Sequence, residues 1–291
     1  MSLVWLAVTG LLGLGGAGCG KSSNGPPAQT ETTDTSKKDD TPSPEGKPAE
    51  ESTSKKPFQR DRLHRSFLDA TRKLPPPDQR PPDRTMTGKS IGKLYGEVVR
   101  LWDSIRFTAA DGTRIGYTAT LETELGNIEI ALDPDLAPNH VRNFIALARV
   151  GYYDGMVFDR IGEDEEVTDD GKKIRYEGIE AGCPLGEGDL LQNSIGYWLN
   201  PEFDPDAHHE EGTVGFCHGR ERDTAACKFY ITLCKAPYLD GNFTVFGKVT
   251  RGLDVARKIF MQPTIIEEDD AGSHRPEKPV VIRKVTIHNK P

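Results

Sequence analysis

One arginine, Arg160, stands among apolar side chains in the segment Phe158–Ile161, which reads FDRI. A guanidinium is always charged and carries a rigid fork of donors, so a fixed arginine can donate a hydrogen bond to an atom that gains a lone pair during a reaction. Aromatic and leucine side chains follow further along the chain, at Tyr230, Tyr238 and Leu239. These residue types could supply a charged donor and apolar surface for a ligand.

Two other groups of side chains could bind metal ions. The stretch 162–176 is rich in acids, but it lacks the spaced D-x-D-x-D-G pattern with a distal Glu that a calcium loop needs. An exposed hairpin is the preferred interpretation, and a calcium loop is the alternative. His208 and His209 lie near cysteines in the sequence, yet their spacing fits no standard zinc site. The sequence therefore predicts no metal and no other cofactor. The acids in the stretch are Glu163, Asp164, Glu165, Glu166, Asp169 and Asp170.

Four cysteines follow Cys19, and none belongs to a C-x-x-C motif. In an exported domain four cysteines can form disulfides, and their spacing leaves three pairings open. Packed thiols or one disulfide are favoured over a metal site. The four are Cys183, Cys217, Cys227 and Cys234.

The periodicity of apolar residues predicts the elements that must position these side chains. Alternating apolar residues predict strands, and residues 137–148 and 253–260 have helical spacing, with Pro138 suited to a first helical turn. Many strands with only two internal helices are typical of a closed antiparallel barrel capped by helices. The predicted strands lie at 115–121, 128–132, 157–158, 214–216, 228–233, 245–249 and 280–287.

Residues 58–107 are expected to form a helical extension that packs on the main domain. Apolar residues suggest a short helix over 63–74, which ends at the prolines 75–77 because proline cannot continue a helix. Three- and four-residue spacing of apolar side chains predicts a second helix over 91–105.

The N-terminus reads as a targeting segment. Leu3–Leu14 is apolar but too short to span a bilayer comfortably, and small residues lead from it to Cys19. This arrangement resembles a bacterial lipoprotein signal, which implies that residues 1–19 are a signal segment and that Cys19 is lipidated. It departs from that pattern in having no Lys or Arg before the apolar run and in having Gly16 where Leu is usual. An ordinary cleaved signal peptide and a short uncleaved anchor are the alternatives.

Residues 20–57 contain only two apolar side chains, Ala28 and Ala49. Such a segment cannot bury enough apolar surface to offset the entropy lost on ordering. It is therefore predicted to be a disordered tether between the signal segment and the folded part.

Seven segments, in this order, resemble bacterial-type cyclophilins, a family of peptidyl-prolyl cis/trans isomerases. The resemblance covers roughly residues 118–289. It implies a mainly β fold with helices: a closed antiparallel eight-stranded barrel capped by two helices, here in a domain 108–291. The segments are TELGNIEIAL, APNHVRNFIALA, GYYDGMVFDRI, GYWLNPEF, HEEGTVGF, RDTAACKFYITL and YLDGNFTVFGKV.

The resemblance also implies the site residues. Arg160 matches the catalytic arginine, and Glu180 replaces a glutamine that binds the substrate backbone and supports the arginine. Ionised glutamate accepts hydrogen bonds but cannot donate them. Glu177 and Gly178 fall where the family has Phe and Met, so part of one pocket wall is expected to be missing. Tyr230 matches the floor of the proline pocket. The substrate-binding positions implied are Phe216, Cys217, His218, Lys228, Tyr230, Tyr238, Leu239 and Phe243, and for each aromatic the alternative is a place in the barrel core.

The reaction of this family is rotation about an X–Pro bond, whose barrier of roughly 20 kcal/mol comes from lost amide resonance. We expect reduced isomerase activity on proline-containing peptides and unfolded exported proteins, and we expect Glu180→Gln to raise it. A non-catalytic peptide- or protein-binding module on the same scaffold is the alternative. The net charge of −8 argues against nucleic acid as a partner. The expected form is a monomer, held in the cell envelope by a lipid anchor and facing the periplasm or exterior.

Overall fold

The structure is a computed structural model that describes residues 65–72, 81–167, 173–188, 194–265 and 273–290. The expected signal segment, with Cys19, and the expected tether lie outside the described residues. Within the described ranges, no helix is both long and apolar enough to cross a membrane.

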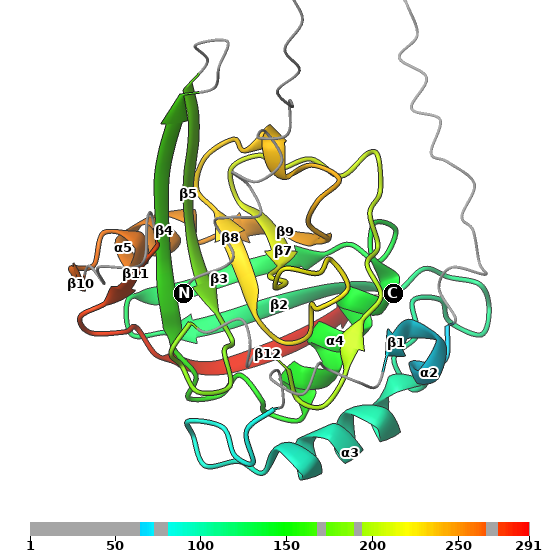
Figure 1. The fold of residues 1–291 in the computed structure, drawn as a ribbon. Helices are drawn as coiled ribbons and strands as arrows, with labels where there is room; N and C mark the ends of the chain where they lie inside the picture. The colour runs from blue at the N-terminus through cyan, green and yellow to red at the C-terminus, as the bar shows by residue number, and fades with distance from the viewer. Residues whose placement is uncertain (1–64, 73–80, 168–172, 189–193, 266–272, 291) are drawn as a thin grey trace, which may run out of the picture.

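Within the described residues, ten strands form one sheet in which every neighbouring pair is antiparallel (Figure 1). Alternating burial along β2 and β3 puts their apolar residues on one face, as the sequence pattern predicts. In the order in which they lie side by side, the strands are β10 (Thr264–Ile265), β11 (Ser273–Pro276), β4 (Phe158–Val167), β5 (Lys173–Ala181), β8 (Phe229–Thr232), β7 (Thr213–Phe216), β9 (Val245–Arg251), β3 (Gly126–Leu132), β2 (Gly116–Thr123) and β12 (Ile282–Lys290).

The described strands do not form the closed eight-stranded barrel expected from the resemblance, and that expectation was wrong in both strand number and closure. β10 and β12 stand at the two ends of the strand order. The reason lies at β4, where β11 pairs with Ile161 and Gly162. Residues 280–282, which lead into β12, meet the first residue of β4 and the residues just before it. The contacts are a bridge between Val157 and Val281 and hydrogen bonds from Phe158 N to Val280 O of 2.9 Å and from Ile282 N to Met156 O of 2.7 Å.

Helix α4 (Pro138–Arg149) packs between the sheet and α3 (Ile91–Trp102), and a smaller helix, α5 (Leu253–Phe260), contacts β3 and β5 (Figure 1). As predicted, proline opens α4 and glycine ends it. Gly151 has φ of +70° and the amide of the next residue, Tyr152, bonds Leu147 O at 2.9 Å, which is the usual pattern of a glycine helix terminus.

The N-terminal extension is held to the domain by aromatic packing and by a short strand. The expected first helix is limited to α2 (Phe67–Ala70), after which β1 (Thr71–Arg72) pairs with β6 (Trp198–Leu199). The Phe67 ring meets the rings of Trp102 and Tyr197 edge to face, with centroids 5.2 and 5.0 Å apart. Such pairs contribute beyond the area that they bury.

Candidate functional site

Four residues stand in a row across neighbouring strands of the sheet. Arg160 on β4 is directly opposite Glu180 on β5, Glu180 is opposite Tyr230 on β8, and Tyr230 is opposite Gly215 on β7. Directly opposed residues of antiparallel strands share one face of the sheet. The register therefore places the predicted arginine, the predicted glutamate and the predicted aromatic floor side by side.

Glycines on this face make room for two tyrosine rings. A Cβ on Gly215 would collide with the hydroxyl of Tyr230, and Cβ atoms on Gly162 and Gly178 would collide with the ring and hydroxyl of Tyr176. The rings therefore lie flat across the sheet surface. Tyr176 is buried and supplies aromatic surface next to the site, where the sequence had predicted that part of a wall would be missing.

Tyr176 comes from a hairpin that rises beyond the rest of the sheet (Figure 1). β5 pairs with β8 only over Gly178–Ala181, whereas its pairing with β4 continues to Lys173 and Val167. The hairpin predicted for the stretch 162–176 is therefore present in the pairing of the described residues. Near the rest of the sheet, however, this hairpin carries the buried Tyr176 in addition to the acids of the stretch.

Two buried cations, one buried carboxylate and one largely buried carboxylate lie together at the Arg160 end of the row. Lys228, fully buried, lies with Nζ 2.6 Å from Glu180 Oε2 and 3.5 Å from Asp159 Oδ1. It also donates to Gly188 O at 3.0 Å, and Arg160 Nη1 donates to the same carbonyl at 3.3 Å. One backbone oxygen thus holds both cations in place.

The charges at this end control one another's ionisation. Burial opposes ionisation of Glu180, but Lys228 and then Arg160 outweigh it and hold the pKa of Glu180 below its ordinary value. Burial would likewise lower the pKa of Lys228, yet Glu180 and Asp159 keep that pKa above its ordinary value. Asp159 is less well compensated, and burial raises its pKa. Lys228 and Glu180 are therefore a charged pair at neutral pH.

Apolar surface lies beside the charged end of the row. Tyr176, Ala236 and Leu239 form one buried cluster, Cys217 and Tyr230 form another, and Phe243 packs against both. The rings of Tyr230 and Phe243 are perpendicular, with centroids 5.9 Å apart. Tyr238, in the short helix η2 (Pro237–Leu239), borders the first cluster. His218 stacks on Phe243 at 4.3 Å.

The structure thus brings together most of the predicted site residues and places one elsewhere. Phe216 packs in the main core against Phe246, with ring centroids 4.6 Å apart, and against His140. Alternation along β7 explains this, because Gly215 already occupies the site face. The residues brought together are Arg160, Glu180, Cys217, His218, Lys228, Tyr230, Tyr238, Leu239 and Phe243.

The four described cysteines are free thiols, three of them buried. Burial, followed by the charge of Glu180, raises the pKa of Cys217 well above its ordinary value, so this thiol next to Tyr230 stays protonated. Within the described residues no group of three or more His, Cys, Asp or Glu side chains is arranged to hold a metal ion.

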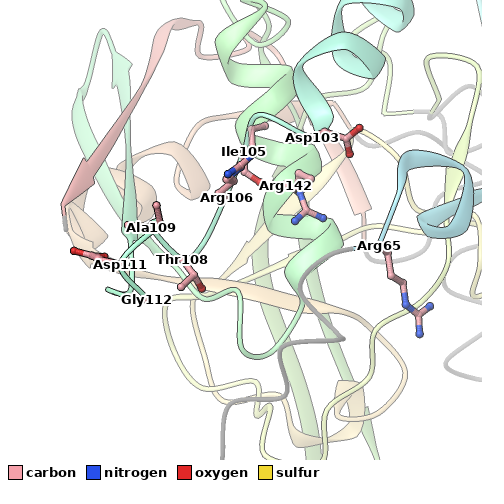
Figure 2. Close-up of a pocket in the computed structure, with 10 residues that line it drawn as sticks. Arg65, Asp103, Ile105, Arg106, Thr108, Ala109, Asp111, Gly112 and Arg142 are labelled. Carbon is pink, nitrogen blue, oxygen red and sulfur yellow. Dashed lines mark hydrogen bonds between the residues drawn. The ribbon is translucent and has the colours of Figure 1, made fainter.

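A separate hollow of about 530 Å³ lies along the chain between α3 and β2 (Figure 2). The buried Arg142 at its wall donates from Nε to Ile105 O at 3.1 Å and lies over the rings of Trp102 and Phe107. These contacts tie the loop to α4. The hollow shares no residue with the row and is lined by Arg65, Asp103, Ile105, Arg106, Thr108, Ala109, Ala110, Asp111, Gly112 and Arg142.

A charged donor on the same sheet face as aromatic side chains suits a small apolar group that needs one hydrogen bond. The sequence model of the family described as cyclophilin type peptidyl-prolyl cis-trans isomerase/CLD matches residues 118–287. The chain belongs to this family.

Curated relatives include small and large proteins. Peptidyl-prolyl cis-trans isomerase ppi1 of Schizosaccharomyces pombe is 34% identical over 56% of this chain and 94% of its own length. Peptidyl-prolyl cis-trans isomerase A of Dickeya dadantii is 27% identical over 68% of this chain and 98% of its own length. The chain spans only 26% of peptidyl-prolyl cis-trans isomerase-like 2 of Gibberella zeae, at 33% identity. The crystal structure of a Cryptosporidium parvum cyclophilin type isomerase aligns with a TM-score of 0.49 and 22% identity, over 60% of this chain and 99% of that one.

Proposed function

We propose that this chain catalyses cis/trans isomerisation of X–Pro bonds, with Arg160 as the catalytic residue. The row Arg160–Glu180–Tyr230 carries this proposal, because it puts a permanent donor next to an aromatic floor on one face of the sheet. As amide resonance is lost, the prolyl nitrogen becomes pyramidal and gains a lone pair. A guanidinium placed beside it binds the transition state more strongly than the ground state.

The proline ring has an apolar seat in this proposal. Tyr230 forms its floor, Phe243 closes it at right angles, and Tyr176 with Leu239 extends the surface toward the hairpin. Binding an apolar ring there removes it from water without leaving a buried polar group unpaired.

Activity is expected to be reduced because of the ion pair. Glu180 stands where an amide would both donate and accept, and it is engaged with Lys228 at 2.6 Å. A carboxylate cannot donate to a substrate carbonyl. The loss of one such contact lowers the rate by roughly tenfold to a hundredfold.

A second candidate function is a peptide- or protein-binding module with little or no catalysis. The observation that favours it is the burial of Arg160, a residue that is only 6% exposed and donates to Gly188 O. A guanidinium committed to the protein's own carbonyl is less available to a substrate nitrogen.

One assay separates the two functions. Isomerisation of a short X–Pro peptide would be followed by NMR exchange or by coupled proteolysis, and binding of the same peptide by calorimetry. We expect turnover in the wild type, and a loss of roughly a hundredfold in kcat/KM for Arg160→Ala with little change in affinity. Arg160→Lys is the matched control, since it keeps the charge but not the fork of donors. Binding without turnover in the wild type would establish the second function.

We also propose that the protein is a bacterial-type, membrane-anchored form that acts on exported proteins. The support is the arrangement of apolar run, small residues, Cys19 and polar tether in the sequence. Expression with a labelled fatty acid, with Cys19→Ser as the control, tests it. Label in the wild type alone is expected, and equal membrane partitioning of both forms without acyl mass would contradict it.

A further inference from the structure

The floor of the candidate proline pocket carries a polar group that the proposed mechanism does not use. Tyr230 is 3% exposed, and its hydroxyl lies 2.7 Å from His209 Nε2. A buried hydroxyl needs a hydrogen-bond partner, and leaving one unpaired is costly. His209 is itself fully buried at the side chain.

Asp240 fixes the state of His209. One Asp240 oxygen lies 2.7 Å from His209 Nδ1 and accepts from His209 N at 2.8 Å, while the other lies 2.9 Å from His208 Nδ1. Burial opposes ionisation of Asp240, but its hydrogen bonds with His208 and His209 hold its pKa below the ordinary value. An ionised carboxylate can only accept. His209 therefore carries its proton on Nδ1, and Nε2 accepts from the hydroxyl of Tyr230.

The hydrogen bond sets the orientation of the tyrosine ring. Gly215 leaves room for the ring to lie over β7, with the hydroxyl above the glycine. The imidazole of His209 is nearly parallel to the ring at 5.9 Å, and Phe243 is perpendicular to it on the site side. If the hydroxyl had no fixed acceptor, the ring would have to move toward solvent, into the space proposed for the proline ring.

We propose that His209, held by Asp240, is a positioning residue for the isomerisation site: it fixes Tyr230 by its hydroxyl so that the ring forms a flat floor for proline. This inference rests on the proposed function, because the floor matters only if proline binds there. His209 acts through Tyr230 and is not placed in contact with substrate.

The positioning role of His209 predicts that isomerase activity depends on pH in the acidic range. Burial lowers the pKa of His209, although the bond to Asp240 opposes this, so His209 is neutral at neutral pH. When it takes a second proton, both ring nitrogens donate and Tyr230 must reverse its hydrogen bond. The titratable groups around His209 are Asp240, His208 and Tyr230, and the Glu210–Lys235 ion pair lies nearby on the surface. The activity should therefore decrease as the pH is lowered below about 6.5, the ordinary pKa of histidine.

The experiment compares two substitutions of His209 in two backgrounds. His209→Gln keeps one donor for Asp240 and one acceptor for Tyr230, whereas His209→Phe keeps only the ring. We expect His209→Phe to lower kcat/KM by about tenfold when residue 230 is tyrosine, and by less than twofold in Tyr230→Phe, which has no hydroxyl to hold. His209→Gln should keep most of the activity at neutral pH and remove the part of the acidic decline that His209 causes. His218 titrates in both proteins and so cancels in the comparison.

The outcomes separate this inference from the proposed function. Equal effects of His209→Phe in both backgrounds, or an unchanged pH profile in His209→Gln, would overturn the positioning role even if Arg160→Ala confirms catalysis. If the wild type has no turnover, the wild type, Tyr230→Phe and the His209→Phe variants of both are compared by affinity for the X–Pro peptide. A loss of affinity confined to the tyrosine background would then support positioning without catalysis. Melting curves of all variants show that each one is folded.

Discussion

Glu180 and Glu202 are both largely buried carboxylates with a pKa below the ordinary glutamate value, but their partners differ. Burial opposes ionisation in both cases. At Glu202 it is outweighed by hydrogen bonds from His140 and from the backbone of Asn139 and His140. At Glu180 it is outweighed first by the charge of Lys228. Glu202 is held by two side chains and two backbone amides together, whereas Glu180 depends first on the charge of one side chain.

Glu202 caps the N-terminus of α4. Its Oε2 accepts from the amides of Asn139 and His140 at 2.9 and 3.0 Å and from His140 Nδ1 at 2.8 Å, and its Oε1 accepts from Asn139 Nδ2 at 2.7 Å. The first amides of a helix have no partner within the helix, and its dipole favours a negative charge there. Both oxygens of Glu202 are hydrogen-bonded, although Nε2 on the far side of the His140 ring is buried without a hydrogen bond.

In the site network the atom without a hydrogen bond is a carboxylate oxygen. Asp159 Oδ1 is buried without a hydrogen bond, 3.5 Å from Lys228 Nζ, although Asp159 Oδ2 accepts from the amide of Cys183 at 3.0 Å. Two carboxylates therefore share one lysine, next to the candidate catalytic Arg160. The comparison teaches that carboxylates sharing one cationic side chain are vulnerable to one substitution, whereas the cap distributes the charge of Glu202 over several donors.

The largest expected effect comes from breaking the side-chain network. Lys228→Met leaves Glu180 and Asp159 buried without their shared cation. Breaking a buried ion pair from one side costs about 3–5 kcal/mol, so we expect this loss in the free energy of unfolding. Urea denaturation followed by circular dichroism measures it.

The double variant Glu180→Gln with Lys228→Gln is the matched control. It removes both charges at similar volume, and Asp159, whose pKa burial already raises, can take up a proton. Replacing a buried pair as a whole is often neutral or stabilising. We therefore expect stability near that of the wild type and at least equal isomerase activity. A double variant as unstable as Lys228→Met would show that the broken ion pair is not the cause of the instability of Lys228→Met.

Breaking the helix cap should have a smaller but clear effect. Glu202→Gln exchanges one acceptor oxygen for an amide group that faces the donors of Asn139 and His140. Hydrogen bonds to a charged group contribute about 1.5–3 kcal/mol, and we expect a loss in this range in the free energy of unfolding. Because the cap lies outside the site, the activity of the folded protein should not change. A large loss of kcat/KM at unchanged stability would contradict the view that the Glu202 cap acts on stability and not on activity.

Acid titration distinguishes the two carboxylates further. A carboxyl group with a lowered folded-state pKa stabilises the protein above its ordinary value, about 4.5, and this contribution is lost as the pH falls through the folded-state value. The wild type should lose stability below about pH 4.5 from both glutamates. The double variant keeps only the contribution of Glu202 and should lose less. Melting temperatures between neutral and acid pH test this, and equal slopes in the two proteins would contradict it.

The sequence predicted the elements that depend on local pattern. Proline and glycine marked the ends of α4, and alternation marked β2 and β3, because these signals act within a few residues. Two-residue strands such as β10 carry too little pattern to be detected, so the true strand order was not predicted.

The sequence prediction named candidate site residues but not the contacts between them. Arg160, Glu180 and Tyr230 were identified singly, whereas their alignment in one row is set by the register of three strands. The pairing of Glu180 with Lys228 was also missed, and it changes the expectation for Glu180→Gln. That single change would leave Lys228 short of a partner and cost stability, so the expected gain in activity requires the double variant. Tyr176 could have been found from its alternation with Gly178 and Glu180 along one strand.

The smallest expected effect comes from an exposed ion pair that sets the baseline for the comparison. Arg72 on β1 pairs with Asp223 at 2.7 Å, and both side chains are more than a third exposed. Water screens such a pair, and exposed pairs contribute only about 0.2–1 kcal/mol. Arg72→Gln should therefore lower the free energy of unfolding by no more than this, even though the pair connects the N-terminal extension to the loop that leads to Lys228.

Raising the salt concentration should remove the difference in stability between the wild type and Arg72→Gln. It should leave the effect of Lys228→Met largely intact, because salt screens buried charges poorly. An effect of Arg72→Gln as large as that of Glu202→Gln would mean that the extension, and not burial alone, stabilises the site network.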